Sequence, residues 1–309
     1  MKNVIVTGAN GFVGSAVIKE LIKHNIEVCA IVKNNDDRLT SLSHVEIFPC
    51  ELSDISNLKN ILPKRDYDTF YHFAWDGNAG DKRFDVELQL ANVKWTIDAL
   101  SVAKELGCRR FIPAGSIIEQ ETMAAVYTDG NRPGLGYIYG GGKVATHIMS
   151  ASVANQIGID LVWAYITNAY GPVELSPRLI NTTIRRIIND ESPKFTSGFQ
   201  NYDFVYIDDV ARAFYLIGKN GKPFHSYLIG SSTARPLKEF LLEMQEAIAP
   251  DLDFIFGEVP FTGVNLPLEA FDCATTKEDT GFEAEVLFKD GVIKTMQWLI
   301  EQRKSDKDY

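Results

Sequence analysis

Short apolar runs alternate with longer segments of helical periodicity over the first half of the chain. The apolar runs predict buried strands at residues 3–7, 27–32, 45–48, 69–73, 110–114 and 160–165. The segments between them predict helices at residues 12–24, 55–62, 84–106 and 138–156. Strands that alternate with helices in this way form a parallel sheet covered by helices. The pattern therefore predicts an α/β fold with a doubly wound, Rossmann-type parallel sheet.

The regular alternation ends after residue 165. Later segments predict helices at residues 179–189, 209–218, 237–249 and 292–303, and strands at residues 204–207 and 226–229. Because the chain returns to the sheet late, we expect residues 1–165 and 203–231 to form the Rossmann domain. Residues 166–202 and 232–309 are then expected to form a smaller, discontinuous C-terminal domain that binds the substrate.

Composition narrows the functional classes. The 309 residues include 31 basic and 41 acidic side chains, and the resulting net charge of −10 disfavours binding to nucleic acid. The four cysteines are far apart in the sequence, so we expect no zinc site or other metal site and no disulfide framework. No apolar stretch is long enough to span a membrane, and the N-terminus lacks the pattern of a secretory signal. We therefore expect a soluble, cytoplasmic protein.

A glycine-rich loop follows the first predicted strand. The run TGANGFVG at residues 7–14 has the pattern Gly-x-x-Gly-x-x-Gly and leads into the first predicted helix. Glycines at these positions allow a tight turn and bring backbone N–H groups close to a pyrophosphate, whose charge the helix N-terminus favours. The sequence therefore predicts a dinucleotide cofactor in contact with Gly8, Asn10, Gly11, Phe12, Val13 and Gly14.

The end of the second strand bears on the choice of cofactor. A carboxylate there hydrogen-bonds the ribose 2'-hydroxyl of NAD, whereas a basic residue suits the 2'-phosphate of NADP. Val32 stands where the carboxylate is expected, Lys33 follows it, and Arg38 is a second basic candidate. The sequence therefore favours NADP and leaves NAD open.

Tyr139 and Lys143 form the candidate reaction centre. Their spacing places a phenol and an ammonium on one helical face, where the ammonium is expected to lower the pKa of the phenol for proton exchange. Tyr215 and Lys219 have the same spacing, so position must decide. Tyr139 follows the fifth strand and lies at the carboxyl edge of the sheet, where ligands bind, whereas Tyr215 lies late in a helix and is expected to pack.

The chain contains seven motifs that follow one another in the same order in a known protein family. They are TGANGFVG (7–14), YHFAW (71–75), Asn92, Ser116, YGGGK (139–143), TNAYGP (167–172) and DFVYIDDVA (203–211). Over nearly its whole length the chain resembles the extended short-chain dehydrogenase/reductases, in the branch of nucleotide-sugar epimerases, dehydratases and reductases. The resemblance implies an NAD(P)-dependent enzyme that acts on a sugar or nucleotide sugar.

The resemblance also implies roles for individual residues. Ser116 would hydrogen-bond the substrate oxygen, Tyr139 would be the acid/base, and Lys143 would bind the nicotinamide ribose. Asn92 resembles a residue that supports the lysine, and Asn168 resembles one that contacts the substrate. Further cofactor contacts are implied for Glu51, Leu52, Phe73, Ala74 and Trp75. His72, by contrast, lies inside an apolar strand and is expected to be a hydrogen-bonded core residue.

The chain departs from the family pattern in two places. Ile117 and Ile118 replace the Asp-Glu pair with which family dehydratases eliminate water, so dehydration is disfavoured. Tyr165 and Tyr202 stand where arginines often serve the pyrophosphate, and Tyr202 is still expected at the substrate. Basic residues that could serve instead are Arg178, Arg185, Arg186 and Arg235.

Three functional hypotheses follow. The favoured one is an NADP-dependent reductase of a keto group in a nucleotide-activated sugar; the alternatives are a 4-epimerase with tightly bound NAD and a non-catalytic, cofactor-binding regulatory protein. The resemblance further implies a homodimer formed by the helices at residues 84–106 and 138–156. Their expected contact stripes are Leu88, Trp95, Ala99, Val102 and Leu106 on the first helix and Val144, Ile148 and Ser152 on the second. Three glycines at residues 140–142 are unusual inside a helix, and close approach of the cofactor or a neighbouring helix would explain them.

Overall fold

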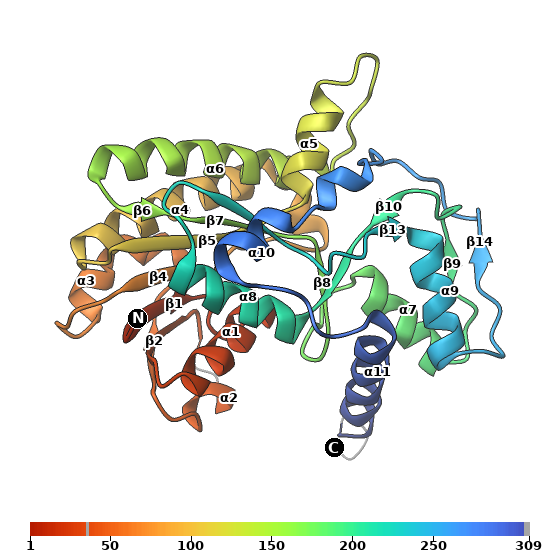
Figure 1. The fold of residues 1–309 in the computed structure, drawn as a ribbon, viewed down its shortest axis with the longest axis horizontal. Coiled ribbons are helices and arrows are strands. Elements are labelled where there is room, and N and C mark those ends of the chain that lie inside the picture. Colours follow the sequence, from red (N-terminus) through yellow and green to blue (C-terminus); the bar gives the residue numbers. More distant parts are fainter. Residues whose placement is uncertain (35–36, 306–309) are drawn as a thin grey trace.

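The centre of the molecule is a parallel sheet (Figure 1). The computed structural model describes residues 1–34 and 37–305. Within these residues the strand order is β12-β7-β5-β4-β1-β2-β3, the short β6 pairs with β5, and the pairings are parallel. The strands are β1 (Asn3–Thr7), β2 (Glu27–Val32), β3 (Val45–Pro49), β4 (Thr69–His72), β5 (Arg110–Ser116), β6 (Asp160–Leu161), β7 (Trp163–Ile166) and β12 (Ser226–Ile229). This order confirms the predicted doubly wound, Rossmann-type fold.

Helices cover both faces of the sheet (Figure 1). One face holds η1 (Leu52–Asn57), α3 (Leu58–Ile61), α4 (Val86–Glu105) and α6 (Tyr137–Ile157), and the other holds α1 (Phe12–Lys23), α8 (Ile207–Asn220) and α10 (Ala274–Thr280). The side chains of β1 show how the sequence builds these layers, because Val4 and Val6 pack with α1 and α8 while Ile5 packs with α4 and α6. Successive residues of a strand face opposite sides of its sheet, so one apolar run supplies both cores.

A smaller region built from later segments lies beside the sheet (Figure 1). Its paired strands are β8 (Asn168–Tyr170) with β11 (Phe204–Tyr206), β10 (Asn201–Tyr202) with β13 (Arg235–Pro236), and β9 (Lys194–Phe195) with β14 (Ile255–Phe256). Its helices are α7 (Leu179–Ile188), α9 (Leu237–Ile248), η3 (Leu268–Phe271) and α11 (Phe288–Ser305). The division into two domains at the stated boundaries stays a prediction. No helix in the described part of the chain has both the length and the apolar composition to cross a membrane.

Several predicted elements differ in extent. The predicted helix at residues 84–106 is divided into η2 (Asp81–Phe84) and α4, because the Asp85 side chain accepts a hydrogen bond from the N–H of Leu88 at 3.1 Å and caps α4. The predicted helix at residues 55–62 covers the end of the 3₁₀ helix η1 and the short helix α3. The short helices α2 (Asp37–Thr40) and α5 (Ile118–Val126) were not predicted, and α5 follows Ser116 directly.

The helix α5 explains part of the glycine run in α6. A Cβ at Gly140 would lie 1.9 Å from Oγ1 of Thr122 on α5, so only glycine fits this contact. A Cβ at Gly142 would lie 3.4 Å from Cβ of Gln89, an ordinary close contact with α4. A Cβ at Gly141 would have no described atom within 4 Å, and nothing in the structure explains that glycine.

Candidate active site

Three predicted residues meet at the carboxyl edge of the sheet. Ser116 is the last residue of β5, while Tyr139 and Lys143 lie in the first turns of α6, four residues apart on one face. The side chain of Ser116 lies near enough to the phenol of Tyr139 to lower its pKa. Tyr139 is 8% exposed and Lys143 is 6% exposed. The fold therefore assembles a partly buried hydroxyl, a buried phenol and a buried amine at the point where the resemblance places a reaction centre.

The protonation state of Tyr139 differs from the prediction. Burial raises the pKa of the phenol, and the guanidinium groups of Arg178 and Arg83, together with the side chain of Ser116, oppose that rise. Lys143 was expected to lower this pKa, but its Nζ lies 5.9 Å from the centroid of the tyrosine ring and points elsewhere. Burial outweighs the nearby positive charges, so the phenol keeps its proton.

The amine of Lys143 is held between β5 and the loop after β4. Its Nζ donates a hydrogen bond to the carbonyl oxygen of Ala114 at 2.9 Å and lies 3.6 Å from the centre of the Trp75 ring. Such a position stabilises a cation through the π-face of the indole. Burial nevertheless lowers the pKa of Lys143 to about 7. Trp75, for which the resemblance implies a cofactor contact, thus lies at the reaction centre.

Asn92 fixes the loop that carries Trp75. Its Nδ2 donates to the carbonyl oxygens of Asp76 at 2.8 Å and Leu88 at 2.9 Å, and its Oδ1 accepts from the N–H of Asp76 at 2.9 Å. Trp75 itself donates from Nε1 to Oε1 of Gln89 at 2.9 Å. Asn92 therefore holds the loop that carries Trp75 against the amine of Lys143. Its support of the lysine is indirect, because it acts through this loop.

The glycine-rich loop has the shape that a dinucleotide needs. Gly8 has a φ of +65°, and a Cβ there would lie 2.7 Å from the backbone nitrogen of Ala74. A Cβ at Gly14 would lie 2.1 Å from the carbonyl oxygen of Gly8. The backbone at Gly8 thus lies against Phe73 and Ala74, and the N-terminus of α1, which begins after Gly11, has no side-chain cap. These backbone N–H groups fit the pyrophosphate of a nicotinamide dinucleotide.

The adenine end of this cofactor site carries an exposed ion pair. Nζ of Lys33 lies 3.3 Å from Oε2 of Glu51, and the two side chains are 63% and 47% exposed. Val32 is buried and Leu52 begins η1. The structure thus brings the predicted contacts Lys33, Glu51 and Leu52 together, but Glu51 partly offsets the charge of Lys33. The side chain of Arg38 lies outside the described residues.

His72 is confirmed as a hydrogen-bonded core residue. Its Nδ1 lies 2.8 Å from Oγ1 of Thr7 and its Nε2 lies 3.2 Å from Oγ1 of Thr96. Burial lowers the pKa of His72 to about 3, so the ring is neutral.

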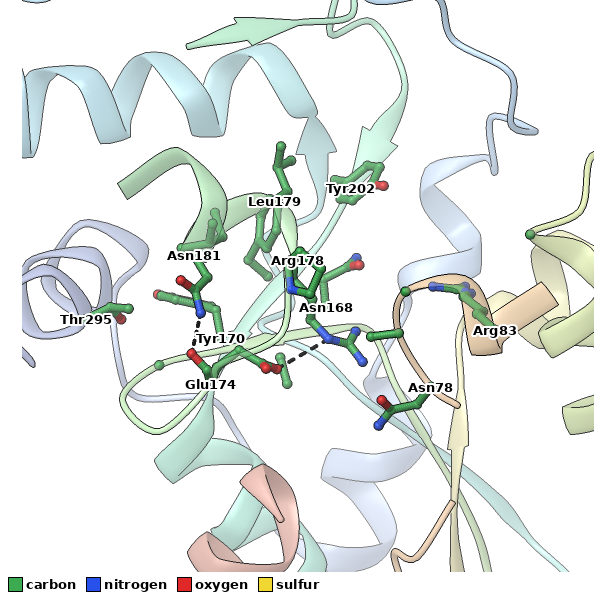
Figure 2. Close-up of a pocket in the computed structure, with 18 of the residues that line it drawn as sticks. Asn78, Arg83, Asn168, Tyr170, Glu174, Arg178, Leu179, Asn181, Tyr202 and Thr295 are labelled. Carbon is green, nitrogen blue, oxygen red and sulfur yellow. Dashed lines mark hydrogen bonds and ion pairs between the residues drawn. The ribbon is translucent and has the colours of Figure 1, made fainter. Parts of the chain in front are cut away.

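A cavity of about 520 Å³ lies near the reaction centre, whose three residues are not among those that line it. Figure 2 shows side chains that line this cavity. The predicted substrate residues Asn168 and Tyr202 line it, and burial raises the pKa of Tyr202 to about 12. Arg83 connects the cavity to the reaction centre, because its guanidinium carbon lies 4.6 Å from the centroid of the Tyr139 ring. Nε of Arg83 is buried and has no hydrogen-bond partner among the described atoms. The sequence analysis missed Arg83, which no motif marks.

One of the four candidate arginines faces this cavity. Arg178 lines it, and its Nε lies 3.3 Å from Oε2 of Glu174. Figure 2 marks this ion pair with a dashed line. Arg235 instead pairs with Glu243. Tyr165 also lies away from the cavity, because its hydroxyl is 3.0 Å from Nδ1 of His147. Arg185 donates to Asn181 at 2.8 Å, and Arg185 and Arg186 line a surface hollow elsewhere.

The helix α5 adds two carboxyl groups that the sequence analysis missed. Glu119 lies behind Ser116, and Glu121 lies beside a second hollow lined by Tyr202. Burial raises the pKa of Glu121 to about 6, and Arg83 opposes the rise. Ile117, at a position where dehydratases resembling this chain carry an acid, is buried in an apolar cluster.

The sequence and the fold were compared with those of known proteins. The model of the NAD dependent epimerase/dehydratase family matches residues 4–230. The dTDP-glucose 4,6-dehydratase of Escherichia coli is 23% identical, with 97% of this chain and 94% of that protein covered. The UDP-N-acetylglucosamine 4-epimerase from Methanobrevibacter ruminantium M1, in complex with UDP-N-acetylmuramic acid, has a TM-score of 0.80 at 20% identity, with 97% and 99% coverage. The UDP-glucuronic acid 4-epimerase from Bacillus cereus, in complex with UDP-glucuronic acid and NAD, has a TM-score of 0.77 at 19% identity, with 97% and 99% coverage. The chain belongs to the NAD dependent epimerase/dehydratase family and is an enzyme of the extended short-chain dehydrogenase/reductase type.

Proposed function

We propose that this enzyme reduces a keto group of a nucleotide-activated sugar, with NADPH as the preferred cofactor. The observation that carries the proposal is that Ser116 and the buried Tyr139 and Lys143 lie beside a cavity lined by two arginines. A bound nicotinamide supplies or accepts a hydride at this place. The side chains of the chain itself must then orient the sugar oxygen and move its proton.

Tyr139 is the proton donor in this reaction. Reduction of a ketone leaves a negative charge on its oxygen, and a neutral phenol can donate a proton to that oxygen. The raised pKa of Tyr139 keeps the phenol protonated, which favours the direction of reduction. Ser116 lowers the pKa of this phenol and would share the substrate oxygen with it. Lys143, once turned from Ala114 toward a bound ribose, would add a positive charge near the phenol.

The lining of the cavity supports an anionic sugar ligand. Arg178 and Arg83 present guanidinium groups, which bind phosphate and carboxylate oxygens in a fork geometry. Arg178 is partly offset by Glu174, whereas Arg83 makes no ion pair with any described carboxylate. We assign the diphosphate to the Arg178 side and the sugar to the Arg83 side, next to Tyr139.

Dehydration is the reaction that the site supports least. Ile117 and Ile118 carry no group that can transfer a proton, and Ile117 is buried in an apolar cluster. The preference for NADPH rests on Val32 and Lys33, because no carboxylate stands at the end of β2. The cofactor is NAD in the Bacillus cereus epimerase, so NAD remains the alternative.

A 4-epimerase is the second candidate. Two solved structures of similar fold are 4-epimerases, and the ion pair of Lys33 with Glu51 weakens the attraction for a 2'-phosphate. An epimerase returns the hydride to the other face of the sugar and consumes no cofactor. Net oxidation of the cofactor therefore separates the two reactions.

The test uses the full-length enzyme with UDP-, dTDP- and CDP-linked sugars and keto-sugars, each with NADPH or NADH. Loss of the nicotinamide absorbance in step with alcohol formation would establish the reductase. Interconversion of sugar epimers without loss of reduced cofactor, by protein purified with NAD bound, would replace it with the epimerase. Release of water from a sugar would overturn both.

A further inference from the structure

A buried carboxylate lies directly behind the reaction centre. Glu119, the second residue of α5, is 3% exposed. Its Oε1 accepts hydrogen bonds from the backbone N–H of Ser116 at 2.9 Å and from Nε1–H of Trp163 at 3.3 Å. Its Oε2 lies 3.2 Å from Nδ1 of His147. Both carboxyl oxygens thus have nitrogen partners, an arrangement that suits the ionised form.

The surroundings of Glu119 are shaped for these contacts. The His147 ring stacks on Trp163 with centroids 4.1 Å apart and an angle of 3° between the planes. The hydroxyl of Tyr165 lies 3.0 Å from the same His147 nitrogen. A Cβ at Gly115 would lie 2.2 Å from Nε1 of Trp163 and 2.7 Å from Oε1 of Glu119. Residue 115 must therefore be glycine if the indole and the carboxylate are to reach the end of β5.

The charge of Glu119 acts on the reaction centre. It raises the pKa of Lys143, against the lowering that burial causes, and it also raises the pKa of Tyr139. Lys143 is faced by Glu119 from α5, by Tyr139 from its own helix and by His72 from β4. Glu119 is itself faced by His147 from α6 and by Tyr165 from β7 through that histidine. Among these groups Glu119 is the only carboxylate.

We propose that Glu119 is a positioning residue that fixes the backbone of Ser116 and sets the electrostatic surroundings of Lys143, whose amine is hydrogen-bonded two residues earlier on β5. The proposal rests on the proposed hydride-transfer function, because it assigns the two effects to the same reaction centre. Glu119 does not touch the reacting atoms, and it acts through Ser116 by a main-chain hydrogen bond and on Lys143 through its charge. No motif of the resemblance contains it.

Glu119→Gln separates the charge from the hydrogen bonds. The amide oxygen can still accept from Ser116 and Trp163, while the negative charge is removed. The Lys143 amine is titrated by NMR in full-length protein with isotope-labelled lysine and no cofactor or substrate, and its signal is assigned by its loss in Lys143→Arg. We expect a midpoint of about 7 in the unchanged protein and a lower midpoint in Glu119→Gln.

Glu121→Gln is the matched control, because Glu121 lies on the same helix and faces Tyr137, Tyr202 and Arg83. It should leave the Lys143 midpoint where it is. An unchanged midpoint in Glu119→Gln, or an equal shift in Glu121→Gln, would overturn the electrostatic part of the proposal.

Glu119→Ala tests the hydrogen bond to Ser116. It removes the acceptor, so the Ser116 amide should exchange with solvent faster than in Glu119→Gln. Equal exchange in the two variants would overturn the positioning part; if the alanine variant does not fold, the midpoint in Glu119→Gln decides alone. Because neither measurement uses substrate, a failed turnover assay for the reductase would leave both results standing.

Discussion

One added methyl group at Gly140 tests how closely α5 packs on α6. The new Cβ would lie 1.9 Å from Oγ1 and 3.1 Å from Cβ of Thr122. Thr122 is 5% exposed, and its hydroxyl donates to the carbonyl oxygen of Ile118 at 2.7 Å. Moving it breaks a hydrogen bond worth about 1 kcal/mol, and overpacking a buried contact costs roughly 1–3 kcal/mol. Alanine restores about 1 kcal/mol through its higher helix propensity. We therefore expect Gly140→Ala to lower the free energy of unfolding by about 1–3 kcal/mol.

Urea unfolding followed by circular dichroism measures this change, as a shift of midpoint at constant slope. Gly141→Ala is the matched control, because a Cβ there meets no described atom within 4 Å. It should stabilise the protein by up to about 1 kcal/mol. Gly140→Ala should also cost much less in a Thr122→Ala background. Equal midpoints for the two glycine variants, or a penalty that persists without the Thr122 side chain, would refute the packing argument.

Three further substitutions test the site and the proposed assembly. Tyr139→Phe should lower turnover by about 10²-fold or more, the scale of a lost general acid, while a binding titration should show unchanged cofactor affinity. Tyr215→Phe, the control, should leave the rate unchanged. Similar rate losses in the two variants would reject Tyr139 as the acid. Arg83→Gln should raise KM for the sugar and move the Tyr139-dependent limb of the pH–rate profile to higher pH, because Arg83 lowers the pKa of Tyr139; an unmoved limb contradicts this assignment. Ile148→Glu should weaken the proposed homodimer, because Ile148 on α6 is 61% exposed; sedimentation that shows a monomer before the substitution removes the dimer.

The exposed fractions of side chains on α4 and α6 also correct the set of residues expected to form the dimer contact. Ala99 is fully buried and Val102 is 2% exposed, and both pack beneath α4 on the sheet. They cannot contact a partner. Exposed apolar side chains lie instead at Leu90 on α4 and at Met149, next to Ile148 on α6. Periodicity shows that a helix has an apolar face, but not whether a sheet or a second subunit covers it.

The bounds of β1 and β2 could be predicted residue by residue, because a continuous apolar run ends in each case at a turn or a polar residue. The helix α5 could not be predicted from the sequence. Its polar Glu119 and Thr122 are buried, while its apolar Met123 and Val126 are 40% and 61% exposed. The pattern of burial is thus the reverse of the pattern of hydrophobicity. A helix of this kind, and the carboxylate that it places behind Ser116, become visible only in three dimensions.

The two tyrosine–lysine pairs show what the sequence could not decide about chemistry. Lys143 Nζ lies 5.9 Å from the Tyr139 ring and Lys219 Nζ lies 5.8 Å from the Tyr215 ring, so the local geometry of the two pairs is nearly the same. Tyr215, however, lies late in α8 and stacks on the ring of His24, at the C-terminal end of α1, at a distance of 3.8 Å. Tyr139 is buried, close to Ser116 and influenced by arginines from distant segments, and these contacts determine its pKa. Spacing therefore identifies only which side chains share a helical face, and the acid at this site is defined by the groups that the fold brings to it.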